Sequence, residues 1–377
     1  MKKILYLIAA AALLLPACSK NVEPAVGTRT IAFQAANYAT KVGISGTIFP
    51  RTESFGVYAW TDNTTGPYFM DNEVVSYQED GLWKTETPYF WPITQAVDFF
   101  CFYPSRMTEL TAEKTKVTYS AYDVEAAYGK DELAQDVMYA DKAANFADYP
   151  DRVPGSASGF SGVPSIFRHA LAKLSAEVSL AYNHKEEADG TVTDWEITLN
   201  SVSLSGIYKK GDCQLVLSDE SAVGVVGWTR PEGNVWTNDG SVLAARNYVE
   251  SAVALAPGEA VAAVPEMMVL PQALAAGQQR ISLNVTIKTT RNGEPFLSET
   301  VDVAADLCIP EVVESWQMNR SVIYRITVNP TRSTGKDPDD PDKPVDPDDP
   351  NLKDVRITFD PAVDGWEMMN VNAVINL

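Results

Sequence analysis

Short runs of β-branched and aromatic residues, separated by Gly, Pro, Asn and Asp, recur along almost the whole chain. The run at 280–290, RISLNVTIKTT, has an apolar side chain at every second residue: Ile281, Leu283, Val285 and Ile287. This period of two is that of a half-buried strand. Many short strands with turn residues between them are typical of antiparallel β-sandwiches. Only the stretch at 124–147 favours helical or mixed structure, so the sequence predicts an all-β fold.

The length and a shift in composition predict the division of the chain. With 377 residues, the chain is long enough for two domains and a tail. We expect an N-terminal β-sandwich domain over 52–172 and a C-terminal one over 173–332, with the boundary near FRHALAKLSAEVSL. Residues 333–351 are almost entirely Asp, Pro, Lys, Gly, Ser and Thr, which cannot build a core. They predict an extended acidic linker before a C-terminal tail at 352–377.

The first residues form a targeting signal. Lys2 and Lys3 precede an apolar run from Ile4 to Leu15 that is too short to span a bilayer comfortably. LPAC follows and ends at Cys18, as in a lipobox, where the thiol of the cysteine receives a lipid. Residues 1–17 are therefore predicted to be a lipoprotein signal peptide. The expected precursor is attached to the outer membrane through lipid on Cys18.

Several kinds of function are disfavoured by the residues. A net charge of −20 opposes binding to nucleic acid, because phosphates need cations. The chain has two histidines and contains no nucleophile elbow, HExxH, Walker or GxGxxG motif. The cysteines that follow Cys18 are far apart in sequence and allow at most one disulfide: Cys101, Cys213 and Cys308. Cys101, between aromatic residues, is predicted to be a buried thiol. We expect no enzyme, no metal site and no cofactor.

The tail contains a predicted strand that must pair with another strand. In MNVNAVINL five apolar residues fall on one face: Met369, Val371, Ala373, Ile375 and Leu377. The other face carries three asparagines, with Val374 as the exception. A strand with such a stripe would be an aggregation hazard if it were left unpaired. It either folds back onto its own second domain or pairs with another subunit by strand addition. The sequence leaves both possibilities open.

Tryptophans near predicted loops raise the possibility of a sugar-binding surface: Trp60, Trp83, Trp91, Trp228 and Trp236. In β-sandwiches such residues more often belong to the core or its rim. A glycan-binding role therefore stays an alternative.

Five stretches in order resemble the fimbrillin-like proteins of Bacteroides-type bacteria, the subunits of type V pili. They are PYFWPITQAVDFFCFYP (88–104), DVMYA (136–140), FRHALAKLSAEVSL (167–180), MVLPQ (268–272) and WQMNRSVIYRITVNP (316–330). The resemblance covers residues 18–332 and is strengthened by the lipobox. It implies two tandem transthyretin-like antiparallel β-sandwich domains.

The resemblance also implies a maturation step. In this family an arginine-specific protease removes the lipid anchor together with the first strand, and a strand from another subunit fills the groove. TIAFQA matches the removed strand, with Ile31, Phe33 and Ala35 as its core residues. Arg51 is the predicted processing site, so 18–51 would be a propeptide. A cut at Arg29 would leave the strand in place. The donor strand would be the apolar stripe from Met369 to Leu377.

The predicted function is that of a structural subunit of a cell-surface fimbria, which contributes to adhesion. Its expected partners are other pilin subunits, the arginine-specific protease, and possible host or bacterial surface ligands. One alternative is a pilus tip adhesin or glycan-binding surface lipoprotein that does not polymerise with itself. Another is an anchor subunit that keeps its lipid and is not cut at Arg51.

Overall fold

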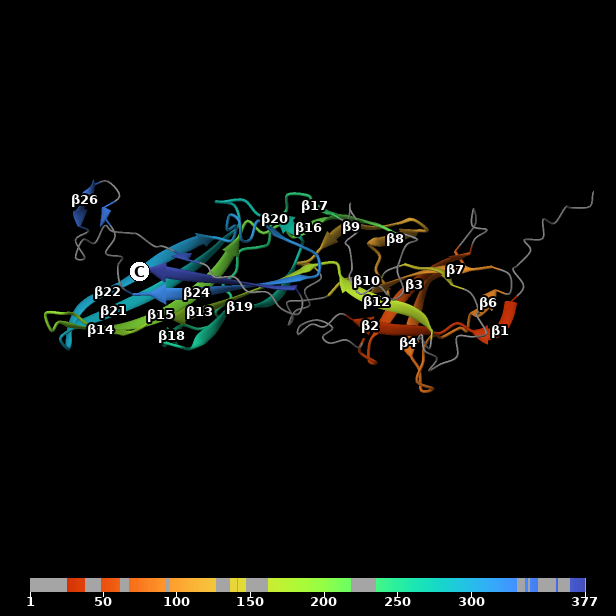
Figure 1. The fold of residues 1–377 in the computed structure, drawn as a ribbon, viewed down its shortest axis with the longest axis horizontal. Coiled ribbons are helices and arrows are strands. Elements are labelled where there is room, and N and C mark those ends of the chain that lie inside the picture. The colour runs from red at the N-terminus through yellow and green to blue at the C-terminus, as the bar shows by residue number, and fades with distance from the viewer. Residues whose placement is uncertain are drawn as a thin grey trace, which may run out of the picture.

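The computed structural model describes residues 26–37, 49–61, 68–92, 95–126, 136–140, 142–146, 162–217, 235–330, 336–337, 340–344, 357–358 and 367–376. Every regular element in these ranges is a β-strand, so the all-β prediction is confirmed. The helical option for 124–147 is wrong where this stretch is described, because it forms two strands there. No helix in the described ranges is long and apolar enough to cross a membrane. The strands form an elongated molecule (Figure 1).

The N-terminal half is built on a sheet that closes into a ring. The strand order is β10-β12-β2-β5-β4-β3-β7, and β10 also pairs with β7. β11 pairs with β7 beside β10. The strands are β2 (Phe33–Asn37), β3 (Ser54–Thr61), β4 (Met70–Tyr77), β5 (Trp83–Thr85), β7 (Val97–Tyr103), β10 (Met138–Ala140), β11 (Ala143–Phe146) and β12 (Val163–His169). Alternate side chains of these strands enclose an aromatic core.

The C-terminal half is a sandwich of two sheets. One sheet has the order β19-β13-β24-β28-β27, and the other β14-β15-β21-β22 with β18 also paired to β15. The first consists of β13 (Ala172–Leu180), β19 (Ala260–Val269), β24 (Arg320–Asn329), β27 (Ile357–Thr358) and β28 (Glu367–Asn376). The second consists of β14 (His184–Glu186), β15 (Val192–Ser205), β18 (Val253–Leu255), β21 (Arg280–Arg291) and β22 (Glu294–Asp306). The period of two in RISLNVTIKTT is confirmed, because its four predicted residues are buried.

A further sheet joins the halves. Its order is β17-β16-β9-β8, so strands from both halves of the chain hydrogen-bond to one another. They are β8 (Leu110–Glu113), β9 (Lys116–Asp123), β16 (Lys210–Val216) and β17 (Val235–Asn238). One continuous core runs from the outer face of the N-terminal ring into the sandwich. The predicted boundary at 172/173 lies at the start of β13, but the division into two domains stays a prediction.

Three small two-stranded sheets lie outside the larger sheets. They are β1 (Val26–Thr30) with β6 (Phe90–Pro92), β20 (Gln272–Ala273) with β23 (Ser315–Trp316), and β25 (Lys336–Asp337) with β26 (Asp340–Pro344). The last pair lies inside the predicted linker. These residues form a short antiparallel hairpin in the structure, and the linker over 333–351 stays a prediction.

Candidate functional site

The ring of the N-terminal half contains β2 as one of its members. β2 runs parallel to β12 over its whole length, from Phe33 opposite Val163 to Asn37 opposite Phe167. On its other side it is antiparallel to β5 through a single registered pair, Phe33 with Trp83. A closed ring has no free strand edges. Without β2, the edges of β12 and β5 would both be unpaired.

Hydrogen bonds to two different segments of the chain fix the residues just before β2. The Ile31 N–H donates to the Tyr89 carbonyl at 2.8 Å, and the Val163 N–H donates to the Ala32 carbonyl at 2.7 Å. The predicted single strand TIAFQA is therefore broken, because Thr30 belongs to β1 on one side and Phe33 to β2 on the other. A Cβ on Gly162 would lie 2.5 Å from the Ala32 carbonyl oxygen, so glycine permits this close approach.

The predicted core residues of the removed strand point into the ring. Ile31 and Phe33 are buried, and Ala35 is partly buried against the same core. The Phe33 ring packs edge-on against Phe55 at 5.9 Å and Phe99 at 5.7 Å between centroids. Edge-to-face aromatic packing at these distances is favourable.

Phe49 is a core residue that the sequence analysis missed. It has no solvent exposure and precedes the predicted cut by two residues. The phenyl group of Phe49 packs against four aromatic side chains of the closed sheet, with centroid distances of 4.8–5.7 Å: Phe55, Trp83, Tyr103 and Phe167. The only signal in the sequence is the apolar pair before Pro50. Phe49 and Phe33 together fill the middle of the aromatic core.

Arg51 lies between these buried residues and β3. It is exposed in a turn, which is closed by a 3.1 Å hydrogen bond from the Glu53 N–H to the Pro50 carbonyl. Its guanidinium lies 4.6 Å from the centre of the Tyr77 ring. A protease could reach this side chain. Arg29 lies in β1, whose backbone is paired with β6.

The residues that follow Arg51 are held independently of β2. The Tyr103 hydroxyl donates to the Glu53 carboxylate at 3.1 Å. Burial and this neighbouring carboxylate raise the pKa of Tyr103. A cut after Arg51 would thus separate Phe33 and Phe49 from the chain and leave the start of β3 attached to β7.

Cys101 lies inside the ring, next to β12. Its side chain is buried, and its Sγ lies 3.4 Å from the Ser165 Oγ. Burial raises the pKa of the thiol to about 12. The prediction of a buried thiol is confirmed. Cys101, Cys213 and Cys308 are all free in the structure.

The predicted donor residues lie in the other half of the molecule. Met369, Val371, Ala373 and Ile375 belong to β28, which runs parallel to β24 from Glu367 opposite Arg320 to Asn376 opposite Asn329. β27 pairs with the far edge of β28. The tail therefore folds back onto its own half in this structure, and β2 fills the groove in the ring. Leu377 and Cys18 lie outside the described residues.

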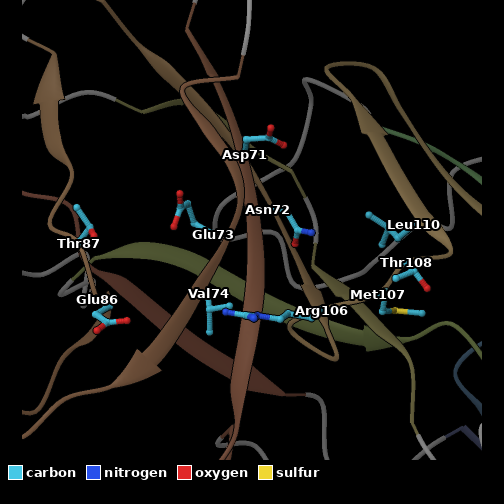
Figure 2. A pocket seen from close by; sticks show the side chains of 10 residues that line it. All are labelled: Asp71, Asn72, Glu73, Val74, Glu86, Thr87, Arg106, Met107, Thr108 and Leu110. Carbon is cyan, nitrogen blue, oxygen red and sulfur yellow. The ribbon is translucent and has the colours of Figure 1, made fainter.

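A surface pocket of about 690 Å³ lies beside β4. Figure 2 shows Asp71, Glu73 and Glu86 with Arg106 among the side chains that line it. None of the described residues that line it is a histidine or cysteine. His169 is elsewhere, buried with its Nδ1 2.7 Å from the Asp136 carboxylate. No group of metal-ligating residues occurs among the described residues.

The tryptophans proposed for sugar binding are mostly internal. Trp60, Trp83 and Trp236 are buried, and Trp91 is half-buried with its ring edge-on to Phe99 at 5.8 Å. Trp228 lies outside the described residues. The four described members of this set thus serve the core or its rim.

Comparisons with known proteins match the sequence of the chain to one family. The profile of the fimbrillin-like family matches residues 40–338. No curated protein matches the chain significantly.

Solved structures similar to the chain include a cell adhesion protein, described as putative, from Bacteroides eggerthii. It is 12% identical, with a TM-score of 0.40, and the alignment covers 95% of this chain and 99% of that one. A protein of the same description from Bacteroides ovatus is 12% identical, with a TM-score of 0.40, and coverage of 79% and 92%. The fimbrial anchor protein of Porphyromonas gingivalis is 10% identical, with a TM-score of 0.25, and coverage of 74% and 83%.

Proposed function

The chain belongs to the fimbrillin-like family, and we propose that it is a structural pilus subunit that polymerises by strand exchange after a cut at Arg51. Membership of the family makes it a fimbria-related adhesion protein of the cell surface rather than an enzyme. Processing, the donor strand and the lipid anchor belong to the proposal.

The burial of Phe33 and Phe49 on the N-terminal side of an exposed arginine carries this proposal. Burial of one phenylalanine side chain contributes about 1.5–3 kcal/mol. Loss of the peptide that ends at Arg51 would leave a hydrophobic hole lined by Phe55, Trp83 and Phe167. It would also leave two unpaired edges, on β5 and β12. Such a groove is unstable in water, so it favours a new strand.

The tail has the properties that a replacement strand needs. β28 already runs parallel to the last strand of the C-terminal half, as β2 runs parallel to β12 at the end of the N-terminal half. Its registered pairs outnumber those of β2, so a transferred β28 could cover the groove fully. Its alternating apolar residues, Met369 to Leu377, would enter the ring, and its asparagines would face outward.

The steps before assembly follow from the N-terminal segment. Lipid on Cys18 would hold the precursor at the outer membrane until an arginine-specific protease cuts after Arg51. The lost propeptide, residues 18–51, would take the lipid with it. The acidic linker would let β28 reach the groove of another copy. The partners in this scheme are pilin subunits and the protease.

The experiment uses residues 19–377, without the lipid. The protein is treated with a low dose of an arginine-specific protease, the new N-terminus is sequenced, and unboiled samples are run on SDS gels. We expect a new N-terminus at Thr52 and a ladder of stable multimers. A clean cut with monomers alone would contradict self-polymerisation and favour the tip-subunit alternative. An uncut Arg51 in the folded protein would favour the anchor alternative.

A further inference from the structure

Two neighbouring apolar residues on β22 are exposed. Phe296 is 49% and Leu297 is 40% exposed, whereas most large apolar side chains of the described residues are covered. They line a pocket of about 610 Å³ together with Trp195 of β15. The Arg291 guanidinium lies 3.9 Å from the centre of the Phe296 ring. Adjacent exposed apolar residues beside a pocket are typical of an interaction site.

Backbone contacts place this patch at the end of the sandwich where β24 ends. Leu180 lies opposite Val328 in the parallel pair β13–β24, and the Ala181 N–H donates to the Val328 carbonyl at 2.9 Å. Two residues on, the Asn183 carbonyl accepts from the Trp195 N–H at 2.9 Å.

The strand register of the second sheet connects Trp195 to Leu297. Trp195 lies opposite Thr289 on β21, and Thr289 lies opposite Leu297 on β22. The patch defined by Trp195, Phe296 and Leu297 therefore lies close to the point where the chain leaves β24. Figure 1 shows β14, β21 and β22 at one end of the long axis, and β6 at the opposite end.

The direction of the strands determines which surface of a neighbouring copy would meet the end of the sandwich where β24 ends. β28 begins beside Arg320 and runs in the same direction as β24, so its release would let the chain continue outward from Asn329. A donor that takes the place of β2 in the same direction runs parallel to β12, from the Val163 end toward His169. β12 leads directly into β13 of the sandwich, so the Val163 end of the groove faces away from the C-terminal half.

A donor that leaves one copy at the β24 end thus enters the next copy at its far N-terminal end. That end carries β6, since the Tyr89 carbonyl just before β6 accepts from the Ile31 N–H at the start of the groove. Successive copies would point the same way, head to tail, which is the arrangement of an open fibre.

On the basis of the proposed function, we propose that the patch of Trp195, Phe296 and Leu297 docks on the β6 end of the next processed copy of this chain. β1 covers the β6 backbone in the precursor, with Val26 opposite Pro92 and Thr30 opposite Phe90. A cut after Arg51 removes β1 together with β2. Phe90 and Trp91, which are half-buried in the precursor, then become a complementary surface. Docking would therefore follow processing.

The test introduces a photo-reactive benzoylphenylalanine at position 297 in residues 19–377. The protein is cut after Arg51, allowed to assemble, irradiated and mapped by mass spectrometry. We expect cross-links from 297 to the segment 86–97 of a neighbouring copy, in the cut sample only. The control places the same group at Val242, which is 46% exposed, and should give no such cross-link.

A second measurement compares assembly rates. The double variant Phe296→Ser/Leu297→Ser keeps the groove and β28, and we expect it to assemble roughly tenfold more slowly or worse. Val242→Ser should assemble at the parent rate. Parent multimers with cross-links elsewhere, including to the same chain's tail, and an unchanged rate in the double variant would overturn the docking surface alone. A parent chain that forms no multimers would overturn the proposed function and this surface with it.

Discussion

β2 and β28 both run parallel to the last strand of their half, yet they differ in what surrounds them. β2 lies within a closed ring between β12 and β5, and its segment contributes the buried Phe33. β28 lies on the outer side of β24, and β24 keeps β13 on its other edge. Removing β2 opens a core, whereas removing β28 leaves the facing sheets of the sandwich in place. The first position is suited to accept a strand and the second to give one.

The largest effect should come from removing the tail. A chain truncated after Pro350 lacks β27 and β28 but keeps the pair β13–β24. After the cut at Arg51 we expect no SDS-resistant multimers, while the uncut variant stays folded by circular dichroism. A truncated chain that still forms a full ladder would contradict the role of β28 as the donor.

The second-largest effect should come from blocking the cut after Arg51. Arg51→Lys preserves the positive charge near Tyr77 but removes the site of an arginine-specific protease. We expect β2 to stay in the ring and multimers to be absent after treatment. Arg29→Lys is the matched control and should assemble like the parent. Assembly of the Arg51→Lys variant would show that the groove need not be opened there.

A stability difference should separate core and surface phenylalanines. Phe49→Ala in the uncut protein removes a fully buried ring and should lower the free energy of unfolding by about 3–5 kcal/mol. Urea denaturation measures this. Phe296→Ala, half-exposed at the far end, should change stability by less than about 0.5 kcal/mol. Equal effects would mean that Phe49 does not anchor the ring.

Cys101 offers a reporter of groove opening. Burial raises its pKa to about 12 and keeps it in the unreactive thiol form in the precursor. Cutting after Arg51 should increase its alkylation rate by iodoacetamide roughly tenfold or more, since β2 lies beside Ser165. Cys213, buried in the sheet that joins the halves, is the internal control and should not change. Equal protection before and after the cut would argue against an opened ring.

The smallest effect should appear at alkaline pH. Burial and the hydrogen bond to the Glu73 carboxylate raise the pKa of Tyr89 from 10.0 to about 12. The neutral phenol therefore favours the folded state below pH 10, and this contribution is lost as the pH rises toward 12. In Tyr89→Phe, the loss of stability over this window should be smaller by about 1 kcal/mol. Tyr248→Phe is the control, and a parent-like profile for Tyr89→Phe would contradict the assignment.

Local patterns predicted the strands better than they predicted their partners. The alternation in MNVNAVINL predicted β28 almost residue by residue, because a strand with one apolar face has only one sensible period. The same alternation could not decide between β24 and a neighbouring copy, because an apolar strand face fits any apolar surface beside an unpaired strand edge. The pairing in cis became visible only in three dimensions.

Two other features depend on distant contacts. The closure of the ring joins β10 to both β7 and β12, which no local pattern could indicate. Phe49 belongs to an apolar pair of only two residues, and its role comes from aromatic partners as far away in the sequence as Phe167. The stretch at 124–147 contains helix-favouring residues, but tertiary pairing with β7 and β12 makes its described part β-structure.

A mixing experiment tests most directly the claim that the groove of one copy accepts the tail of another. The acceptor is cut after Arg51 and truncated after Pro350, and the donor is the Arg51→Lys chain with its tail intact. Each alone should stay monomeric, and together they should form a single one-to-one complex that resists SDS without boiling. No complex, or an equal amount of complex when the donor is also truncated after Pro350, would contradict the account.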